Sequence, residues 1–138
     1  MDVRSGSLAA ILLSLAMLGG PRTLGAQSSA SATWQATPAS VLKAALRSVA
    51  AGQERYRAAH GRYAASAEQL DVRLAPGVRV DILGAGATGW QGRAVHQVQP
   101  GRSCVVFVGA LDGAEAPRTD GDREMAGEEG IPLCDWMR

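Results

Sequence analysis

The sequence predicts an α+β domain in which one long N-terminal helix packs on an antiparallel sheet of three or four strands. Three observations predict this fold. Apolar residues recur at helical spacing early in the chain, a pattern of period two follows, and two cysteines lie late enough to close a C-terminal loop. With 138 residues, the chain is long enough for one domain and too short for two.

The helix is predicted over residues 38–60. Thr37 is placed to cap its first turn, and Pro38 suits the first helical position, where a missing N–H costs no hydrogen bond. Gly61 suits the left-handed position that ends a helix. The apolar stripe, with one polar interruption, comprises Val41, Leu42, Ala45, Leu46, Val49, Gln53 and Tyr56.

Strands are predicted after the turn signal at Pro76 and Gly77. They cover residues 78–83, 90–98 and 103–110, separated by the glycine-rich segment 84–89 and the turn 99–102. Such short connections predict an antiparallel meander. We expect the core to contain Val41, Leu42, Leu46, Val49, Tyr56, Tyr63, Leu70, Val78, Val80, Ile82, Val106 and Val108.

The first residues resemble an export signal. Arg4 precedes an apolar stretch at residues 8–18 that is too short to span a bilayer. Cleavage is predicted after Ala26, with a second candidate site at residues 30–32 and a retained membrane anchor as the alternative. The predicted parts are a signal peptide (1–26), a flexible segment (27–37) and the folded domain (38–138). Export places the protein in the periplasm or outside the cell, without a membrane span once the signal is cut.

Export also decides how the two cysteines are interpreted. In an oxidising compartment, Cys104 and Cys134 most simply form one disulfide. That bond would close a loop of roughly 30 residues and contribute about 3.5 kcal/mol in the chain-entropy treatment.

Charge and composition argue against nucleic acid as a partner. The formal net charge is +1, which gives no global field to attract a polyanion or an acidic membrane. Five arginines could form a basic surface, but with three Trp, two Tyr and one Phe there are few rings on which bases could stack. Those arginines are Arg47, Arg55, Arg57, Arg62 and Arg93.

The motifs of catalysis are also missing, and we predict that the protein is not an enzyme. No G-x-S-x-G elbow occurs, and "GAGATG" lacks the lysine of a phosphate-binding loop and precedes a strand. His60 and His96 have no acid or nucleophile that sequence places beside them.

An acidic loop is the most distinctive late feature. Residues 112–129 hold seven acids against Arg118 and Arg123. We expect the loop Asp112–Leu133 to face protein partners. The same loop supplies candidate calcium ligands, although an EF-hand counted from Asp120 would need Gly at Met125 and Glu at Ile131. The candidates are Asp112, Asp120, Asp122 and Glu124, and a purely solvated loop is the alternative. No other metal or cofactor is predicted.

The helix, the meander and the disulfide-closed loop together resemble the globular part of type IV pilins and pseudopilins. Residues 45–70, "ALRSVAAGQERYRAAHGRYAASAEQL", are similar to the family's run of helix, Gln-Glu, Tyr, a glycine turn, Tyr and Leu. Residues 89–109 resemble its later strand pair, and Cys104–Cys134 resembles its disulfide-bounded loop, which often faces partners or neighbouring subunits.

The resemblance implies a non-enzymatic binding or assembly role in a pilus or secretion-type system. The family's prepilin leader and long apolar assembly helix have no counterpart in this sequence. We therefore expect a pilin-like domain released from the filament, or one used as a soluble adaptor. The alternatives are a small periplasmic enzyme or inhibitor and a calcium-binding secreted domain.

Overall fold

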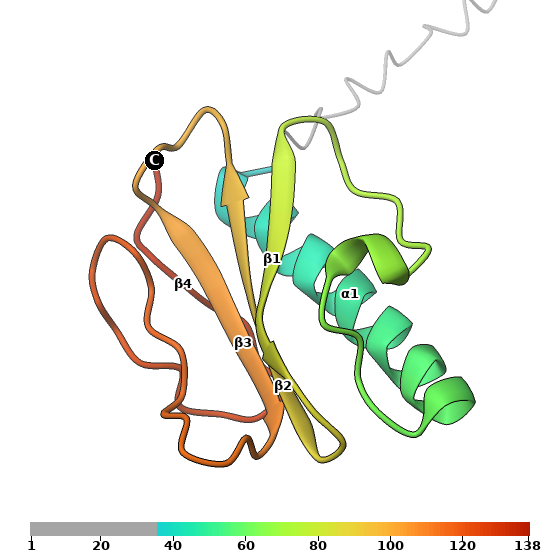
Figure 1. The fold of residues 1–138 in the computed structure, drawn as a ribbon. Coiled ribbons are helices and arrows are strands. Elements are labelled where there is room, and N and C mark those ends of the chain that lie inside the picture. Colours follow the sequence, from blue (N-terminus) through green and yellow to red (C-terminus); the bar gives the residue numbers. More distant parts are fainter. Residues whose placement is uncertain (1–35) are drawn as a thin grey trace, which may run out of the picture. The chain divides into compact units, whose positions relative to one another are not determined.

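The computed structural model describes residues 36–138, so the predicted signal peptide and most of the segment 27–37 lie outside the described residues. A long helix, α1, lies across one face of a four-stranded antiparallel sheet, which confirms the predicted fold class (Figure 1). The strands follow one another in the sheet in chain order. The elements are α1 (Pro38–His60), the 3₁₀ turn η1 (Ala67–Gln69), β1 (Val78–Ala85), β2 (Gly89–His96), β3 (Ser103–Gly109) and β4 (Leu133–Cys134).

Helix α1 begins and ends where its caps predict. The Thr37 side chain accepts a hydrogen bond from the Ser40 N–H at 3.2 Å. Gly61 adopts φ 72° and donates its N–H to the Arg57 carbonyl at 2.8 Å, a conformation that a residue with a Cβ adopts at a cost. No helix within residues 36–138 is both long enough and apolar enough to cross a bilayer.

The end of α1 is locked to the segment that follows it. The buried Gln53 amide donates to the Ala64 carbonyl at 2.9 Å and accepts from the Ala64 N–H at 2.7 Å. The Tyr63 hydroxyl donates to Glu54 at 3.1 Å; burial and then this bond raise the pKa of Tyr63. Gln53, the polar interruption in the apolar stripe, therefore holds the end of α1 to the segment that follows it.

The first hairpin is tighter than predicted. The sequence predicts a loop at 84–89, but β1 continues to Ala85 and β2 starts at Gly89. A bulge at Leu83 allows this, because Gly84 and Ala85 still pair with Gln91 and Trp90. Strand β2 also ends at His96, two residues before the predicted end at 98, where a turn begins.

The core lies between α1 and the sheet. Of the predicted core residues, seven are buried: Leu42, Leu46, Val49, Tyr63, Leu70, Val80 and Val106. Tyr56, Val78, Ile82 and Val108 are half-buried and pack against these, and Val41 is half-buried at the groove between α1 and residues 73–75. The largest fully buried side chain, Trp90, was not predicted. Its ring lies beside Gly92, where a Cβ would come within 2.7 Å of Trp90 Cζ3.

Candidate protein-binding surface

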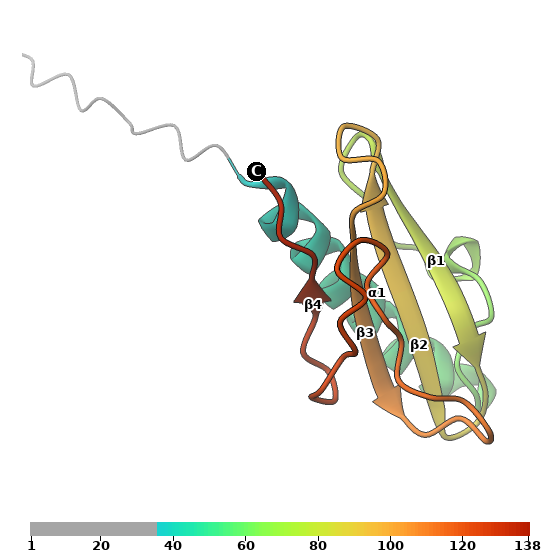
Figure 2. The same ribbon diagram turned by 90° about the vertical axis from the view of Figure 1, so that its left-hand side faces the viewer.

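The chain between β3 and β4 folds across the sheet face opposite α1 (Figure 2). Side chains of β3 alternate between the two faces: Cys104 and Val106 belong to the helix-side core, and Val105 points the other way. Val105 is nevertheless fully buried, as is the loop residue Thr119, and Ala126 is 3% exposed. The acidic loop therefore covers part of the sheet and has a small buried base of its own.

The predicted disulfide joins the two ends of this loop. Cys104 and Cys134 are directly paired in neighbouring strands, with their Cα atoms 3.9 Å apart. Both sulfur atoms lie 3.9 Å from the Ala39 carbonyl oxygen of the first turn of α1. The bond thus connects the loop to the helix-side core, and it is compatible with an oxidising compartment.

A buried carboxylate organises the loop from below. Asp135, 2% exposed, accepts hydrogen bonds from the backbone N–H groups of Ser103 (2.8 Å), Gly121 (2.9 Å) and Asp122 (2.6 Å). Its own N–H donates to the Ser103 carbonyl at 2.9 Å. One side chain therefore ties strand β3, the loop and the C-terminal segment together.

The ionisation of Asp135 follows from these bonds. Burial by itself would raise the pKa of the Asp135 carboxyl. The N–H of Asp122, the Thr119 hydroxyl and the N–H groups of Gly121 and Ser103 outweigh burial, and the pKa is lowered. Asp135 is thus a carboxylate at neutral pH, committed to structure.

Two predicted calcium ligands are held by arginines. Arg93 pairs with Asp120 at 3.2 Å and with Asp81 at 2.9 Å, and Arg102 pairs with Asp122. The hydrogen bond to Asp81, foremost, raises the pKa of Arg93, although burial lowers it.

The other two predicted calcium ligands, Asp112 and Glu124, are exposed. The described structure does not bring the four together, and residues 36–138 contain no cluster of three or more His, Cys, Asp or Glu side chains able to hold a metal ion.

A hollow of about 320 Å³, lined by both apolar and acidic residues, lies within residues 124–133 of the loop. Met125 and Ile131 line it and are 41% and 56% exposed, whereas Pro132 is buried and Leu133 half-buried. Two exposed apolar side chains therefore lie at one concavity, whereas single scattered ones are common on protein surfaces. The hollow lies inside the loop predicted to face partners.

Acidic side chains flank this hollow. Glu124 and Glu128 line it, both are exposed, and among residues 36–138 neither carboxylate takes part in an ion pair or side-chain hydrogen bond. Glu129 is different, since its carboxylate accepts from the Gly109 N–H at 2.6 Å. The loop therefore contains acids that bond to the rest of the fold and acids that face solvent.

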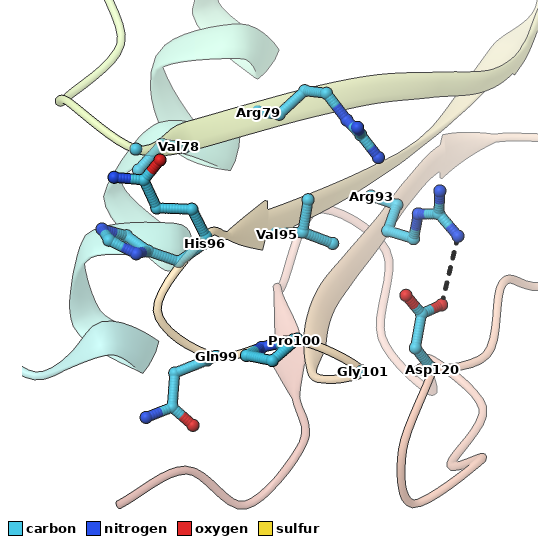
Figure 3. A pocket seen from close by; sticks show the side chains of 11 residues that line it. Val78, Arg79, Arg93, Val95, His96, Gln99, Pro100, Gly101 and Asp120 are labelled. Carbon is cyan, nitrogen blue, oxygen red and sulfur yellow. Dashed lines mark hydrogen bonds and ion pairs between the residues drawn. The ribbon is translucent and has the colours of Figure 1, made fainter.

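A second concavity, of about 520 Å³, lies near the β1–β2 edge of the same sheet face (Figure 3). His96 and Asp120 both line it but lie at opposite ends, with Val95 between them, and Asp120 points to Arg93. His96 Nδ1 accepts from the Val98 N–H at 3.2 Å. Within the described residues 36–138, no acid forms a hydrogen bond or ion pair with His96. His60 is exposed and packs against Tyr56 with ring centroids 4.1 Å apart.

Sequence patterns did not reveal Asp135 or the hollow. Asp135 follows Cys134 in an unpatterned tail, and its role depends on backbone groups of strand β3 and of the loop. The hollow is assembled from Met125, Ile131 and β4, which are apolar positions in a stretch without periodicity. The available signal was the mixture of apolar residues with acids inside the disulfide-bounded span.

Comparison of the chain with protein-family models and with curated protein sequences finds no match. In this chain, the loop between β3 and β4 is fastened at its base by a disulfide and a buried carboxylate. The same loop leaves a hollow with apolar and acidic lining residues open to solvent.

Proposed function

We propose that this chain is an exported, pilin-like protein that binds a protein partner through the loop Asp112–Leu133, in a pilus or secretion-type system, without catalysing a reaction. The observation that carries the proposal is the hollow beside Met125 and Ile131, displayed on an ordered loop. A surface that is ordered before binding loses little conformational freedom when a partner arrives.

The α+β fold supports the resemblance on which the proposal also rests. A long helix on an antiparallel sheet, followed by a disulfide-closed loop, is the arrangement expected of a pilin-like globular domain. The enzyme alternative has less support, because an active site needs convergent polar groups, and the groove beside His96 keeps His96 and Asp120 apart.

The proposal can be tested in the native host by photo-crosslinking. Gly127 is suited to a photoreactive residue, because a Cβ there would meet no atom within 4 Å. The matched control position is Ala58, exposed on α1. We expect a discrete protein adduct from position 127 and none from position 58. Equal labelling from both positions, or none from either, would contradict partner binding through the loop.

The location of the protein in the cell distinguishes assembly into a fibre from a role as a soluble adaptor. Surface fibres are sheared from cells, and the fibre, periplasmic and medium fractions are probed for this protein under non-reducing conditions. Recovery with the fibres indicates assembly; recovery in a soluble fraction indicates an adaptor. Recovery in the cytoplasm, with Cys104 and Cys134 reduced, would contradict export.

Calcium binding stays a separate prediction. Asp120 and Asp122 would have to leave Arg93 and Arg102 to become ligands. Binding should give a heat signal in calorimetry and raise the melting temperature. A flat melting temperature and no heat at millimolar Ca²⁺ would remove it.

A further inference from the structure

We infer that the partner presents an apolar side chain flanked by lysine or arginine, and that this side chain enters the hollow between Glu124 and Glu128. The inference rests on the proposed function, because it names the chemistry of the partner that the loop binds. The hollow lies in residues 124–133, and four of its lining residues are apolar: Met125, Ile131, Pro132 and Leu133.

The size of the hollow suits a peptide side chain. At about 320 Å³ it is at the small end of ligand sites, too small to enclose a large cofactor. Met125 adapts its shape easily, which suits a surface that accepts an apolar side chain. Burial of a leucine-sized side chain should strengthen binding by about tenfold or more.

The walls of the hollow are held in place before any partner arrives. On one side, Ala126 donates its N–H to the Pro117 carbonyl at 2.9 Å. On the other, Gly130, with φ 75°, donates to the Phe107 carbonyl at 2.8 Å, and Ile131 donates to Glu128 at 3.3 Å. Leu133 is paired with Val105 in the sheet. The hollow is therefore part of the fold.

The charge around the hollow selects the sign of the partner. Glu124 and Glu128 are the charged lining residues, and within residues 36–138 no basic residue lines the hollow. The carboxylates of Asp120, Asp122 and Glu129, by contrast, are engaged in the fold. A cationic segment gains attraction on both sides of its apolar residue, and an acidic segment meets like charges.

The probe that tests this is a fluorescein-labelled peptide with one leucine flanked by two lysines on each side, in a Gly-Ser background. Binding to the purified protein is followed by fluorescence anisotropy. Two control peptides replace the leucine by serine or all lysines by glutamate. We expect the serine peptide to bind at least about tenfold more weakly, the glutamate peptide to show no binding, and the affinity to fall as salt rises.

Matched variants assign the effect to the hollow. Glu124→Gln with Glu128→Gln should weaken the lysine peptide about five- to tenfold and flatten the salt dependence. Asp112→Asn with Glu115→Gln, exposed acids outside the hollow, should leave binding within about twofold. Ile131→Ser should weaken binding about tenfold, and Leu83→Ser, an exposed apolar residue on β1, should not.

The outcomes separate this inference from the proposed function. If the glutamate peptide binds as well as the lysine peptide, or if the Glu124 and Glu128 variants bind normally, the charge selection is wrong. If no peptide binds while the Gly127 adduct persists in cells, the loop binds a partner of other chemistry and the inference is overturned alone. An adduct formed between two copies of this chain also overturns it.

Discussion

The two faces of the sheet are covered in different ways. On one face, α1 contributes Leu42, Leu46 and Val49 to a continuous apolar core with Trp90. On the other, the loop is fastened largely by hydrogen bonds to Asp135 and by ion pairs, with a smaller buried set around Val105. The apolar core is shared by α1 and the long strands, whereas each directed bond on the second face joins only a few groups. Single substitutions should therefore act globally on the first face and locally on the second.

The largest expected effect is on the helix side. Leu46→Ala should lower the free energy of unfolding by about 4 kcal/mol, because Leu46 is fully buried and its truncation leaves a cavity. Urea denaturation followed by circular dichroism measures the loss. The matched control is Leu83→Ala, whose side chain is 47% exposed and should cost less than about 1 kcal/mol. A similar loss in both variants would show that burial between α1 and the sheet does not determine the cost.

Removal of the disulfide should cause the second-largest loss of stability. Replacing Cys104 and Cys134 by serine removes the cross-link between residues 30 positions apart in the sequence. The unfolding free energy should fall by about 3.5 kcal/mol. The expected signature is a melting temperature that falls for the oxidised wild type on reduction, but not for the double variant. A wild-type melting temperature unchanged by reductant would show that the loop contributes no such constraint.

Asp135→Asn should lower the stability of the loop by about 2–3 kcal/mol and leave the helix side largely unaffected. Asp135→Asn keeps the size of the side chain but leaves backbone donors without a charged acceptor. Hydrogen exchange should speed up at the Gly121 and Asp122 amides while the amides of α1 stay protected. Asp112→Asn, an exposed acid of the same loop, is the control. Equal acceleration in α1 would mean that the two faces unfold together.

The pH dependence of Asp135 has a defined sign. Its pKa is lower in the folded protein than the value of about 3.9 for an unfolded aspartate, so folding favours the carboxylate. Its stabilisation is complete above that unfolded value and is lost as the pH falls through the lower folded pKa. The unfolding free energy of Asp135→Asn should therefore fall less steeply below about pH 4 than that of wild type. Identical acid profiles would remove the assignment.

The smallest effect is expected at a half-exposed ion pair. Arg102→Gln breaks the pair with Asp122, whose side chains are 36% and 34% exposed, and should cost less than about 1 kcal/mol. The difference between variant and wild type should shrink in high salt, because exposed charges are screened. A larger, salt-independent loss would place Arg102 among the supports of the Asp135 cluster.

The predictable part of the fold is the part built on periodicity. Thr37, Pro38 and Gly61 predicted the limits of α1, and alternation in β1 together with the turn signals around β2 and β3 predicted the three long strands. Their inward residues were largely assigned to the core. Trp90 was missed because it follows a glycine-rich segment that suggested a loop, and the bulge at Leu83 that extends the hairpin has no sequence signature.

The position of the candidate site in the chain could be predicted from the sequence, but the contacts of its individual side chains could not. The disulfide and the acidic composition predicted a displayed loop, and the structure confirms the disulfide. The sequence cannot distinguish Asp122, whose carboxylate accepts from the Trp136 N–H at 2.7 Å, from the solvent-facing Glu124. That difference depends on which backbone groups the tertiary fold brings near each acid, and periodicity carries no such information.

The disulfide allows the loop to change in sequence independently of the helix and the sheet. The loop leaves β3 at Gly109 and returns to pair with Cys104 of the same strand, so its two ends are joined independently of what lies between them. Each doubling of a flexible loop costs only about 0.6 kcal/mol in closure entropy. The segment near Gly113, where a Cβ would meet no atom within 4 Å, can accept inserted residues while the helix and sheet persist. New recognition sequences can thus be exchanged on a constant scaffold, by mutation or by grafting.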